Sequence, residues 1–396
     1  MRRPLAPAAL ACFLALATAV PVRAQTWDLS AYALGLAARA DASELGPGGT
    51  TFVGRFRFMP VATVHGVTLD VAYEHVLTRN PEGGAFSLTP GGAETRGGDW
   101  MGADWDVRTT TRTAWRHRLD RASLSWESGR SSVTVGRQPI SWATTLFLTP
   151  ADPFAPFDPS DSFREYRAGV DAVRVRLSPG PFSEVEAVVR AAETPDGTRY
   201  SALARAQTSV GAWAVGAWGG SLHGEAAGAV FATGAVGATA LRSEASLRRG
   251  EDGGAVLRAA LGADRRLSAG GRDLFLVGEA QFDGFGAGRA SRLLDVARSR
   301  PFRRGELQTL GRWTAAAQAS WQAHPLVSLD AMVLASLTDG SALLAPGVTW
   351  SASGAASVRL GAYLGRGADG VDPVRGLASE YGPIPFFAYA AVSWFF

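Results

Sequence analysis

The chain has 396 residues, of which 46% are hydrophobic and 19% charged, a composition that excludes an intrinsically disordered protein. All 39 basic residues are arginine, and three of them lie in the first 24 residues, which contain no acidic residue. The remaining 36 arginines balance 36 Asp and Glu residues, so the charge gives no argument for nucleic acid as a partner. The one cysteine, Cys12, lies in the same first segment, so residues 25–396 offer no disulfide or zinc–thiolate site.

The first 24 residues have the features of an export signal. Arg2 and Arg3 precede an apolar stretch over residues 4–21, and Val22 and Ala24 occupy the two positions that a signal peptidase reads. We therefore expect residues 1–24 to be a signal peptide that is cleaved after Ala24, which leaves residues 25–396 as a single exported domain.

Beyond this segment, apolar and polar residues alternate with a period of two, which is typical of β-strands. Segments of about ten residues with one apolar face fit tilted transmembrane strands. One such segment alternates Val67, Leu69, Val71 and Tyr73 with Thr68, Asp70, Ala72 and Glu74. The pattern predicts an all-β fold, a transmembrane antiparallel β-barrel that encloses an aqueous lumen.

The alternation predicts about eighteen strands, with sixteen as the alternative. Both numbers are even, as single-chain bacterial barrels require. The expected strands cover 26–40, 50–60, 62–75, 107–127, 132–142, 169–177, 182–192, 199–208, 209–219, 222–232, 236–248, 254–264, 273–283, 306–323, 326–337, 342–352, 356–365 and 385–396. In residues 209–241 the sequence does not show which side chains point inward and which point outward, because this segment is so rich in Gly and Ala.

The connection lengths support this assignment. The long connections fall on one side of the barrel, which we expect to be extracellular, and those on the other side are mostly short, such as Met59-Pro60-Val61 and His324-Pro325. The long set includes 41–49, 76–106, 143–168, 193–198, 284–305 and 366–384.

The last segment carries a specific signal. Alternate apolar residues end in the aromatic residue Phe396, as in the terminal strands that the barrel assembly machinery reads. Aromatic residues there also suit the interface with outer-membrane lipids. We therefore expect the bacterial outer membrane as the location.

Residues 133–142 read VTVGRQPISW, and they are followed by TPADPFAPF over 149–157 and RAGVDAVRV over 167–175. These stretches resemble a Gram-negative outer-membrane porin-like group with a Gly-Arg-Gln strand motif, and they are also similar to eighteen-stranded alginate-export barrels. This sequence departs from the motif at the entry to the loop, where Ala143 stands in place of the Gly expected after the Trp. The resemblance implies passage of solutes across the outer membrane.

The polar strand faces carry more arginines than acids, and rings of Arg favour anions. We expect Arg112 and Arg116 to line the pore. Arg174 and Arg176 are predicted to line it nearly opposite Glu184 and Glu186, across a short turn. Two readings stay open: an anion-selective wall, or Arg–Glu pairs that neutralise each other and stiffen it.

The connection 143–168 is the best functional candidate. Its four prolines restrict it, and its phenylalanines favour a position away from water, so we expect it to fold inward and narrow the lumen. Asp152, Asp158 and Asp161 would then face arginines of the wall. An extracellular loop packed against its neighbours is the alternative.

Two positions break the strict alternation. Arg137 shares the face of Val133 and Val135, where a charge would be costly in lipid, so we expect a bulge at Gly136 to turn Arg137 inward. A second phase shift is predicted near Asp120-Arg121, because the apolar face changes there.

Three functions follow as hypotheses. The first is a passive porin-like channel for small hydrophilic solutes with a preference for anions. The others are an exporter of an anionic polysaccharide and a surface-binding barrel scaffold. The five His residues show no metal-ligand spacing, and no nucleophile elbow or phosphate-binding loop is present, so we expect no enzyme, no cofactor and no metal.

Overall fold

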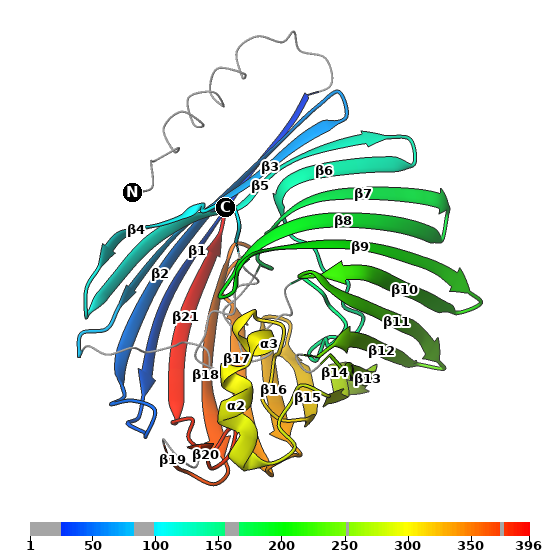
Figure 1. The fold of residues 1–396 in the computed structure, drawn as a ribbon. Helices are drawn as coiled ribbons and strands as arrows, with labels where there is room; N and C mark the ends of the chain where they lie inside the picture. Colours follow the sequence, from blue (N-terminus) through cyan, green and yellow to red (C-terminus); the bar gives the residue numbers. More distant parts are fainter. Residues whose placement is uncertain (1–24, 83–98, 155–165, 251–252, 373–375) are drawn as a thin grey trace.

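The computed structural model describes residues 25–82, 99–154, 166–250, 253–372 and 376–396. The proposed signal peptide therefore lies outside the described residues. Across the described part of the chain, eighteen long strands pair antiparallel with their neighbours in sequence, and β1 closes the ring on β21 (Figure 1). The prediction of an eighteen-stranded barrel is confirmed, and the alternative of sixteen strands is wrong.

The ring is built from β1 (Gln25–Ala40), β2 (Gly49–Val64), β3 (Val67–Arg79), β5 (Thr113–Ser128), β6 (Ser131–Gln138), β7 (Val170–Gly180), β8 (Ser183–Thr194), β9 (Gly197–Val210), β10 (Trp213–Leu222), β11 (Glu225–Val236), β12 (Thr239–Arg249), β13 (Ala255–Ala269), β14 (Arg272–Asp283), β15 (Trp313–His324), β16 (Val327–Ser336), β17 (Ser341–Ser351), β18 (Ala356–Arg366) and β21 (Phe387–Phe395). A further short strand, β4 (Asp104–Thr109), pairs with β5 beyond the end of β6.

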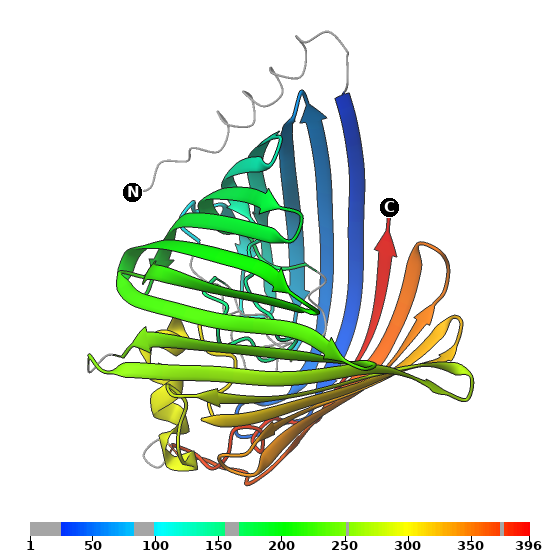
Figure 2. The ribbon, with the colours of Figure 1, turned by 90° about the vertical axis from the view of Figure 1, so that its right-hand side faces the viewer.

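The connections divide the barrel into a short-turn end and a long-loop end. At the short-turn end, residues 65–66, 129–130 and 325–326 form tight turns, and both the start of β1 and the end of β21 lie there. The long-loop end holds the described residues of three long connections, namely 139–154 with 166–169, 284–312, and 367–372 with 376–386 (Figure 2). Two of its hairpins, at 195–196 and 223–224, are nevertheless only two residues long.

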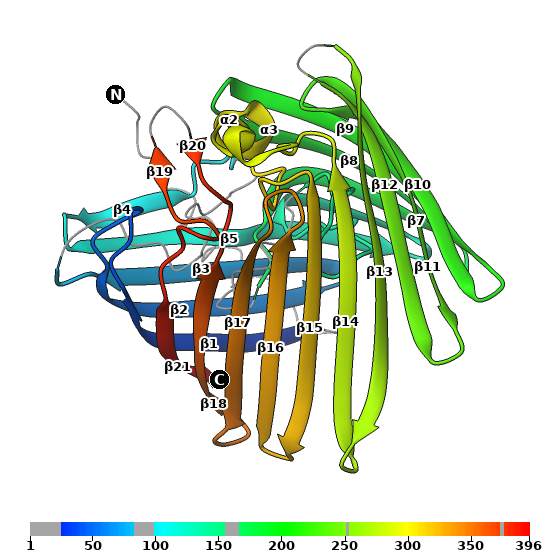
Figure 3. The same cartoon turned by 90° about the horizontal axis from the view of Figure 1, so that it is seen from below.

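The long-loop end carries the only helices among the described residues. The connection 284–312 contains the 3₁₀ turn η1 (Ala290–Arg292) and two short helices, α2 (Leu293–Arg298) and α3 (Arg300–Arg303). The connection 367–386 contains the small pair β19 (Val371–Asp372) and β20 (Gly376–Leu377). Figure 3 shows α2 and α3 between the β8–β9 side and β19–β20. In the part of the chain that the structure describes, none of the helices reaches the length and apolarity needed to cross a bilayer.

One predicted turn is wrong. The sequence suggested a turn at Met59-Pro60-Val61, but β2 continues through Pro60 to Val64 and turns at His65-Gly66. Proline has no N–H to donate, and the pairing of β2 with β3 is interrupted at residues 59–60 while the pairing with β1 is continuous. The alternation of apolar and polar residues cannot show that a proline interrupts the pairing with only one neighbouring strand, so a proline within a strand reads as a turn.

The two faces of the wall differ as the alternation predicts. Outward side chains such as Phe56, Trp126 and Val173 are exposed, and they form an apolar band that suits lipid. Inward side chains are largely polar along β2, β5, β7, β8 and β12, but not everywhere. On β1 the inward residues Tyr32, Leu34 and Leu36 are buried in an apolar cluster.

This inner apolar cluster extends over β16–β18 and β21 and includes Leu334, Leu343, Tyr363, Phe387 and Tyr389. Leu148 of the connection 139–169 and Tyr381 of the connection 367–386 pack into it. One side of the interior is therefore apolar, and residues of two long connections pack against it.

Candidate functional site

The connection 139–169 leaves the wall at the end of β6, and its described part runs inside the ring. Its described residues are 139–154 and 166–169. They reach inward-facing side chains of β8, β10, β12 and β14, which follow β7 around the wall. We call residues 141–154 the inner loop.

Two buried carboxylates of the wall hold the backbone of the inner loop. Glu279 on β14 accepts hydrogen bonds from the backbone N–H groups of Leu146 (2.6 Å), Phe147 (2.9 Å) and Leu148 (2.8 Å). Glu244 on β12 accepts from Thr144 (2.7 Å), Thr145 (3.3 Å) and Ala151 (2.9 Å). Six backbone N–H groups of the loop thus have buried acceptors on the wall, and these contacts fix its path.

Side chains complete the attachment of the inner loop. The Trp142 indole donates to Glu186 on β8 at 2.9 Å, and the ring packs against Phe154 and Trp218. The Trp218 indole donates in turn to the carbonyl of Ala151 at 3.0 Å. The loop is thus fixed to β8, β10, β12 and β14 together.

Asp152 does not face the wall as expected. It is buried, accepts a hydrogen bond from Ser141 at 2.7 Å, and forms an ion pair with Arg167 at 3.0 Å. Both partners belong to the same connection, so Asp152 ties its outgoing arm to its returning arm. Asp158 and Asp161 lie outside the described residues.

Arginines and carboxylates line the opposite wall in a dense network. Arg57 contacts Glu74 at 3.1 Å and Asp120 at 2.6 Å, and Arg118 contacts the same two carboxylates at 3.1 and 3.7 Å. Arg55 lies 3.8 Å from Glu74. A further pair, Arg121 with Asp70 at 3.8 Å, extends this wall network toward the short-turn end.

The wall network contains four arginines and three carboxylates, namely Arg55, Arg57, Arg118 and Arg121 with Asp70, Glu74 and Asp120. Tyr166, on the returning arm of the connection, stacks over Arg57 at 4.6 Å. Arg57 is therefore covered, whereas Arg55, Arg118 and Arg121 remain partly exposed to the interior.

The predicted phase shift near Asp120-Arg121 is confirmed and explains how this network forms. Ala72 on β3 pairs with Arg121 on β5, and the next residue, Tyr73, pairs with Leu119. Asp120 is therefore the extra residue of a β-bulge on β5. The bulge leaves Asp120 buried beside Arg57. The sequence pattern predicted a phase shift at this position, but it did not predict which arginines the bulge brings together.

The pairs predicted across the β7–β8 turn form only in part. Arg174 contacts Glu186 at 2.8 Å, and Glu184 lies 3.6 Å from Arg205 on β9. Arg176 stands opposite Glu186 in register, but its side chain donates to the hydroxyl of Ser132.

Arg112 and Arg116 lie apart from the inner loop. Arg112 belongs to the exposed connection between β4 and β5, and Arg116 is half exposed, 3.8 Å from Asp106 of β4. The structure therefore places both at the long-loop end rather than beside the loop.

The expected bulge at Gly136 is wrong. The register of β6 with β5 and β7 is continuous through Arg137, although Gly136 has a φ of 115°. Arg137 is instead buried at the point where β6 leaves the wall. It donates to Asp171 at 2.8 Å and to the carbonyl of Leu119 at 3.0 Å.

A distant segment covers this ion pair. The backbone N–H groups of Trp100 and Met101 donate to Asp171 at 2.7 and 2.8 Å, and Asp99 lies 3.3 Å from Arg137. Residues 99–101 thus shield Arg137 from lipid, and Asp171 neutralises its charge. The side chain therefore does not need a bulge that turns it to the other face of the strand.

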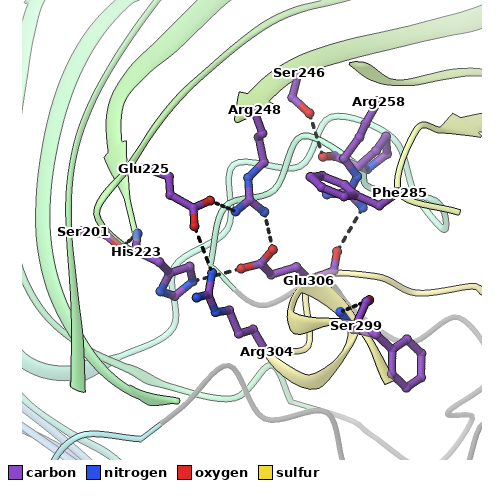
Figure 4. A network of polar contacts seen from close by, with 12 residues as sticks. Ser201, His223, Glu225, Ser246, Arg248, Arg258, Phe285, Ser299, Arg304 and Glu306 are labelled. Atoms are coloured by element: carbon purple, nitrogen blue, oxygen red, sulfur yellow. Dashed lines mark hydrogen bonds and ion pairs between the residues drawn. The ribbon is translucent and has the colours of Figure 1, made fainter. Parts of the chain in front are cut away.

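A second polar network joins the connection 284–312 to the wall (Figure 4). Glu306 forms an ion pair with Arg248 on β12 and lies 3.3 Å from His223. Arg304 contacts Asp196 at 3.1 Å and Glu225 at 3.7 Å. Burial and the surrounding arginines lower the pKa of His223 to about 3, so this histidine is neutral. Sequence reasoning missed this network because its members come from five separate connections and strands.

No family model matches the sequence, and no curated protein matches it. The fold is similar to solved structures of bacterial barrels. They include the outer membrane protein OpdK from Pseudomonas aeruginosa, with a TM-score of 0.57 and 10% identity over 94% of this chain and 98% of that chain. OccAB1 from Acinetobacter baumannii gives a TM-score of 0.57 and 9% identity over 94% and 96% of the two chains.

A BenF-like porin from Pseudomonas fluorescens gives a TM-score of 0.56 and 10% identity over 95% and 99%. The motif over residues 133–175 and the alginate-export resemblance find no support in these comparisons. The chain has the fold of Gram-negative outer-membrane porins.

Proposed function

We propose that the protein is an outer-membrane porin, a passive channel for small hydrophilic solutes with a preference for anions. The long-loop end faces outward and the short-turn end faces the periplasm. Signal peptide cleavage after Ala24 and recognition of the strand ending at Phe396 by the assembly machinery belong to the same proposal. The observation that carries it is the inner loop, which Glu244 and Glu279 hold across the barrel interior.

A loop held in this position narrows the lumen, while the wall of the barrel keeps its fold. The narrowed passage runs between the inner loop and the wall network, whose four arginines outnumber its three carboxylates. Arginine remains charged at every accessible pH and its planar fork matches a carboxylate. A positive wall opposite a fixed loop thus supports passage of small anions.

The ligand bound to one structural neighbour is consistent with this class of solute. OpdK from Pseudomonas aeruginosa has been solved with vanillate, in a structure that matches this chain with a TM-score of 0.54 and 11% identity. Vanillate carries a carboxylate. For the present channel we propose solutes that carry a carboxylate, and not vanillate in particular.

The test is the ion selectivity of the protein reconstituted in a planar bilayer. Under a KCl gradient, we expect a reversal potential that reports preference for chloride. In the double variant Arg55→Ser with Arg121→Ser, the potential shifts toward cation preference, because Glu74 and Asp70 lose partly exposed partners. The matched control, Arg112→Ser with Arg116→Ser, removes the same charge far from the inner loop and leaves the potential near that of the wild type.

Absence of any current through correctly folded protein contradicts a channel function. A conducting wild type that prefers cations leaves the channel standing and contradicts the anion preference.

A further inference from the structure

Positive charge is concentrated in one short segment at the long-loop end. Residues 289–304, which contain η1, α2 and α3, hold six arginines and a single acid, Asp295. Arginines and acids balance over residues 25–396, so this surplus is a local feature. The arginines are Arg289, Arg292, Arg298, Arg300, Arg303 and Arg304.

The segment is held on a fixed base. Leu293 and Val296 on one side of α2 are buried with Leu307 and Ala287 in a small apolar cluster, against which Leu377 of β20 packs. The backbone N–H groups of Leu310 and Gly311, just beyond the segment, donate to Glu380 at 2.7 and 2.9 Å. Attachments on both sides hold the arginines in place before any ligand arrives.

Most of these arginines remain open to water. The side chains of Arg292, Arg300 and Arg303 are 61%, 54% and 47% exposed, and Arg289 and Arg298 are also exposed. Arg304 alone is buried. The surface of α2 and α3 therefore presents several guanidinium groups together.

Few carboxylates contact these arginines, and one of the carboxylates, Glu225, reaches only the buried Arg304 of this set, at 3.7 Å. Asp196, in the turn between β8 and β9, lies 3.1, 3.6 and 3.7 Å from Arg304, Arg303 and Arg300. One carboxylate thus serves three guanidinium groups. Asp295 pairs with Arg292 within the segment itself.

The segment lies over the interior rather than against the outer apolar band. Arg304 and Glu306 reach the buried cluster around Arg248 and Arg258, whose side chains face inward (Figure 4). On the other side, α2 and η1 contact β20 (Figure 3). A ligand bound to these arginines stands at the mouth of the barrel.

We propose that η1, α2 and α3 form an outer binding site for small multivalent anions that carry phosphate or clustered carboxylate groups. Each guanidinium offers two parallel donors to such a group, and several cations together favour a ligand with more than one negative charge. The site captures these anions at the mouth and raises their local concentration there. This role rests on the proposed channel function and extends it, because it selects solutes before they reach the inner loop.

The test uses inorganic pyrophosphate as the probe and the triple variant Arg292→Ser, Arg298→Ser and Arg300→Ser. The matched control is Arg265→Ser, Arg266→Ser and Arg272→Ser, which removes three arginines at the opposite end of the barrel, around the β13–β14 turn. Equilibrium dialysis of the detergent-solubilised protein at 0.05 M salt measures binding directly and needs no current. We expect affinity to fall by about tenfold in the triple variant and to be unchanged in the control.

Bilayer recordings give the second readout. Pyrophosphate added to the long-loop side is expected to block the wild type with an association rate about tenfold above that of the triple variant. The difference disappears near 1 M KCl, where charges are screened over about 3 Å. If the triple variant fails to assemble, Arg298→Glu alone is expected to reduce binding in the same direction, because its side chain is exposed.

Equal pyrophosphate binding by wild type and folded variant overturns the site. Binding that is lost in the variant while no current flows in any protein supports the site and refutes the channel. Purified lipopolysaccharide, added at matched phosphate concentration, distinguishes a lipid source from a free solute. Competition with pyrophosphate overturns the assignment to free solutes, and absence of competition supports it.

Discussion

The backbone N–H of Leu148 donates a 2.8 Å hydrogen bond to the carboxylate of Glu279, a residue 131 positions later in the chain. This contact joins the tip of the inner loop to β14. Leu148 also packs its side chain into the apolar cluster on β1, β16–β18 and β21. The tip is therefore fixed by polar contacts on one side and by apolar packing on the other.

Removal of the Glu279 carboxylate is expected to release the inner loop. Glu279→Ala abolishes three backbone hydrogen bonds to an ionised acceptor, each of which contributes about 1.5–3 kcal/mol. We expect larger single-channel conductance and greater current noise. The control Glu184→Ala removes a wall carboxylate that contacts Arg205 rather than the loop, and conductance should stay close to that of the wild type. Unchanged conductance and noise in Glu279→Ala would refute the view that this tether sets the width of the passage.

Arg137 is expected to be a stabilising residue and not part of the conduction pathway. Arg137→Met leaves the carboxylate of Asp171 buried without its ion pair, and breaking such a buried pair costs about 3–5 kcal/mol. The folded fraction, measured from heat-modifiable mobility in SDS gels, should fall, while protein that does fold keeps its reversal potential. Arg130→Met, at an exposed short turn, should fold like the wild type. A changed selectivity in folded Arg137→Met protein would place Arg137 in the passage after all.

Gly136 is expected to tolerate no side chain. Its φ is 115°, and a Cβ at this position would lie 2.3 Å from the carbonyl oxygen of Ala122. Backbone strain of this kind costs about 1–3 kcal/mol before the clash is added. Gly136→Ala should therefore lower the temperature of heat modification. Gly35→Ala, where an added Cβ meets nothing within 4 Å, is the control and should have no such effect.

The long-loop end is expected to loosen as pH rises from 4.5 to 7. Burial raises the pKa of Glu380 to about 7 from its ordinary value of 4.5. Between these values the folded state keeps a proton that the opened state loses, so the contact with Leu310 and Gly311 is strongest below pH 4.5 and weakens as pH rises through 7.

Hydrogen exchange of residues 310–311, corrected for the intrinsic dependence of exchange on pH, measures this opening. Protection should fall between pH 5 and 8 in the wild type. Glu380→Gln has no titrating proton and should show a flat profile, and a wild type with equally flat protection would contradict the assignment.

Local patterns were sufficient to predict the barrel. Two-residue alternation and the aromatic end at Phe396 depend only on neighbouring residues, and they led to the correct number of strands and to nearly all strand positions. The shift at Asp120 could be predicted for the same reason. The inward apolar face of β1, with Tyr32 and Leu34, could not, because its partners are Leu148 and residues near the other end of the chain.

The candidate site was less accessible to sequence reasoning. Glu244 and Glu279 look like ordinary wall acids, and their partners are backbone groups about 100 and 130 residues away. Strand alternation placed Arg137 on the lipid-facing side and could not show how its charge is shielded. The shielding comes from another connection, because Trp100 and Met101 cover its partner Asp171. Sequence patterns report strand faces, whereas these contacts depend on where a loop ends in space.

The tether between Glu279 and the inner loop has a consequence for how such a protein can diversify. Every donor at residues 146–148 is a main-chain amide, which any amino acid except proline supplies. The exposed side chain of Leu146 can therefore be exchanged with little effect on the position of the tip, whereas Leu148 is also held by its buried side chain. Permeability can therefore be changed through the side chain at position 146 while the backbone contacts that hold the tip stay the same.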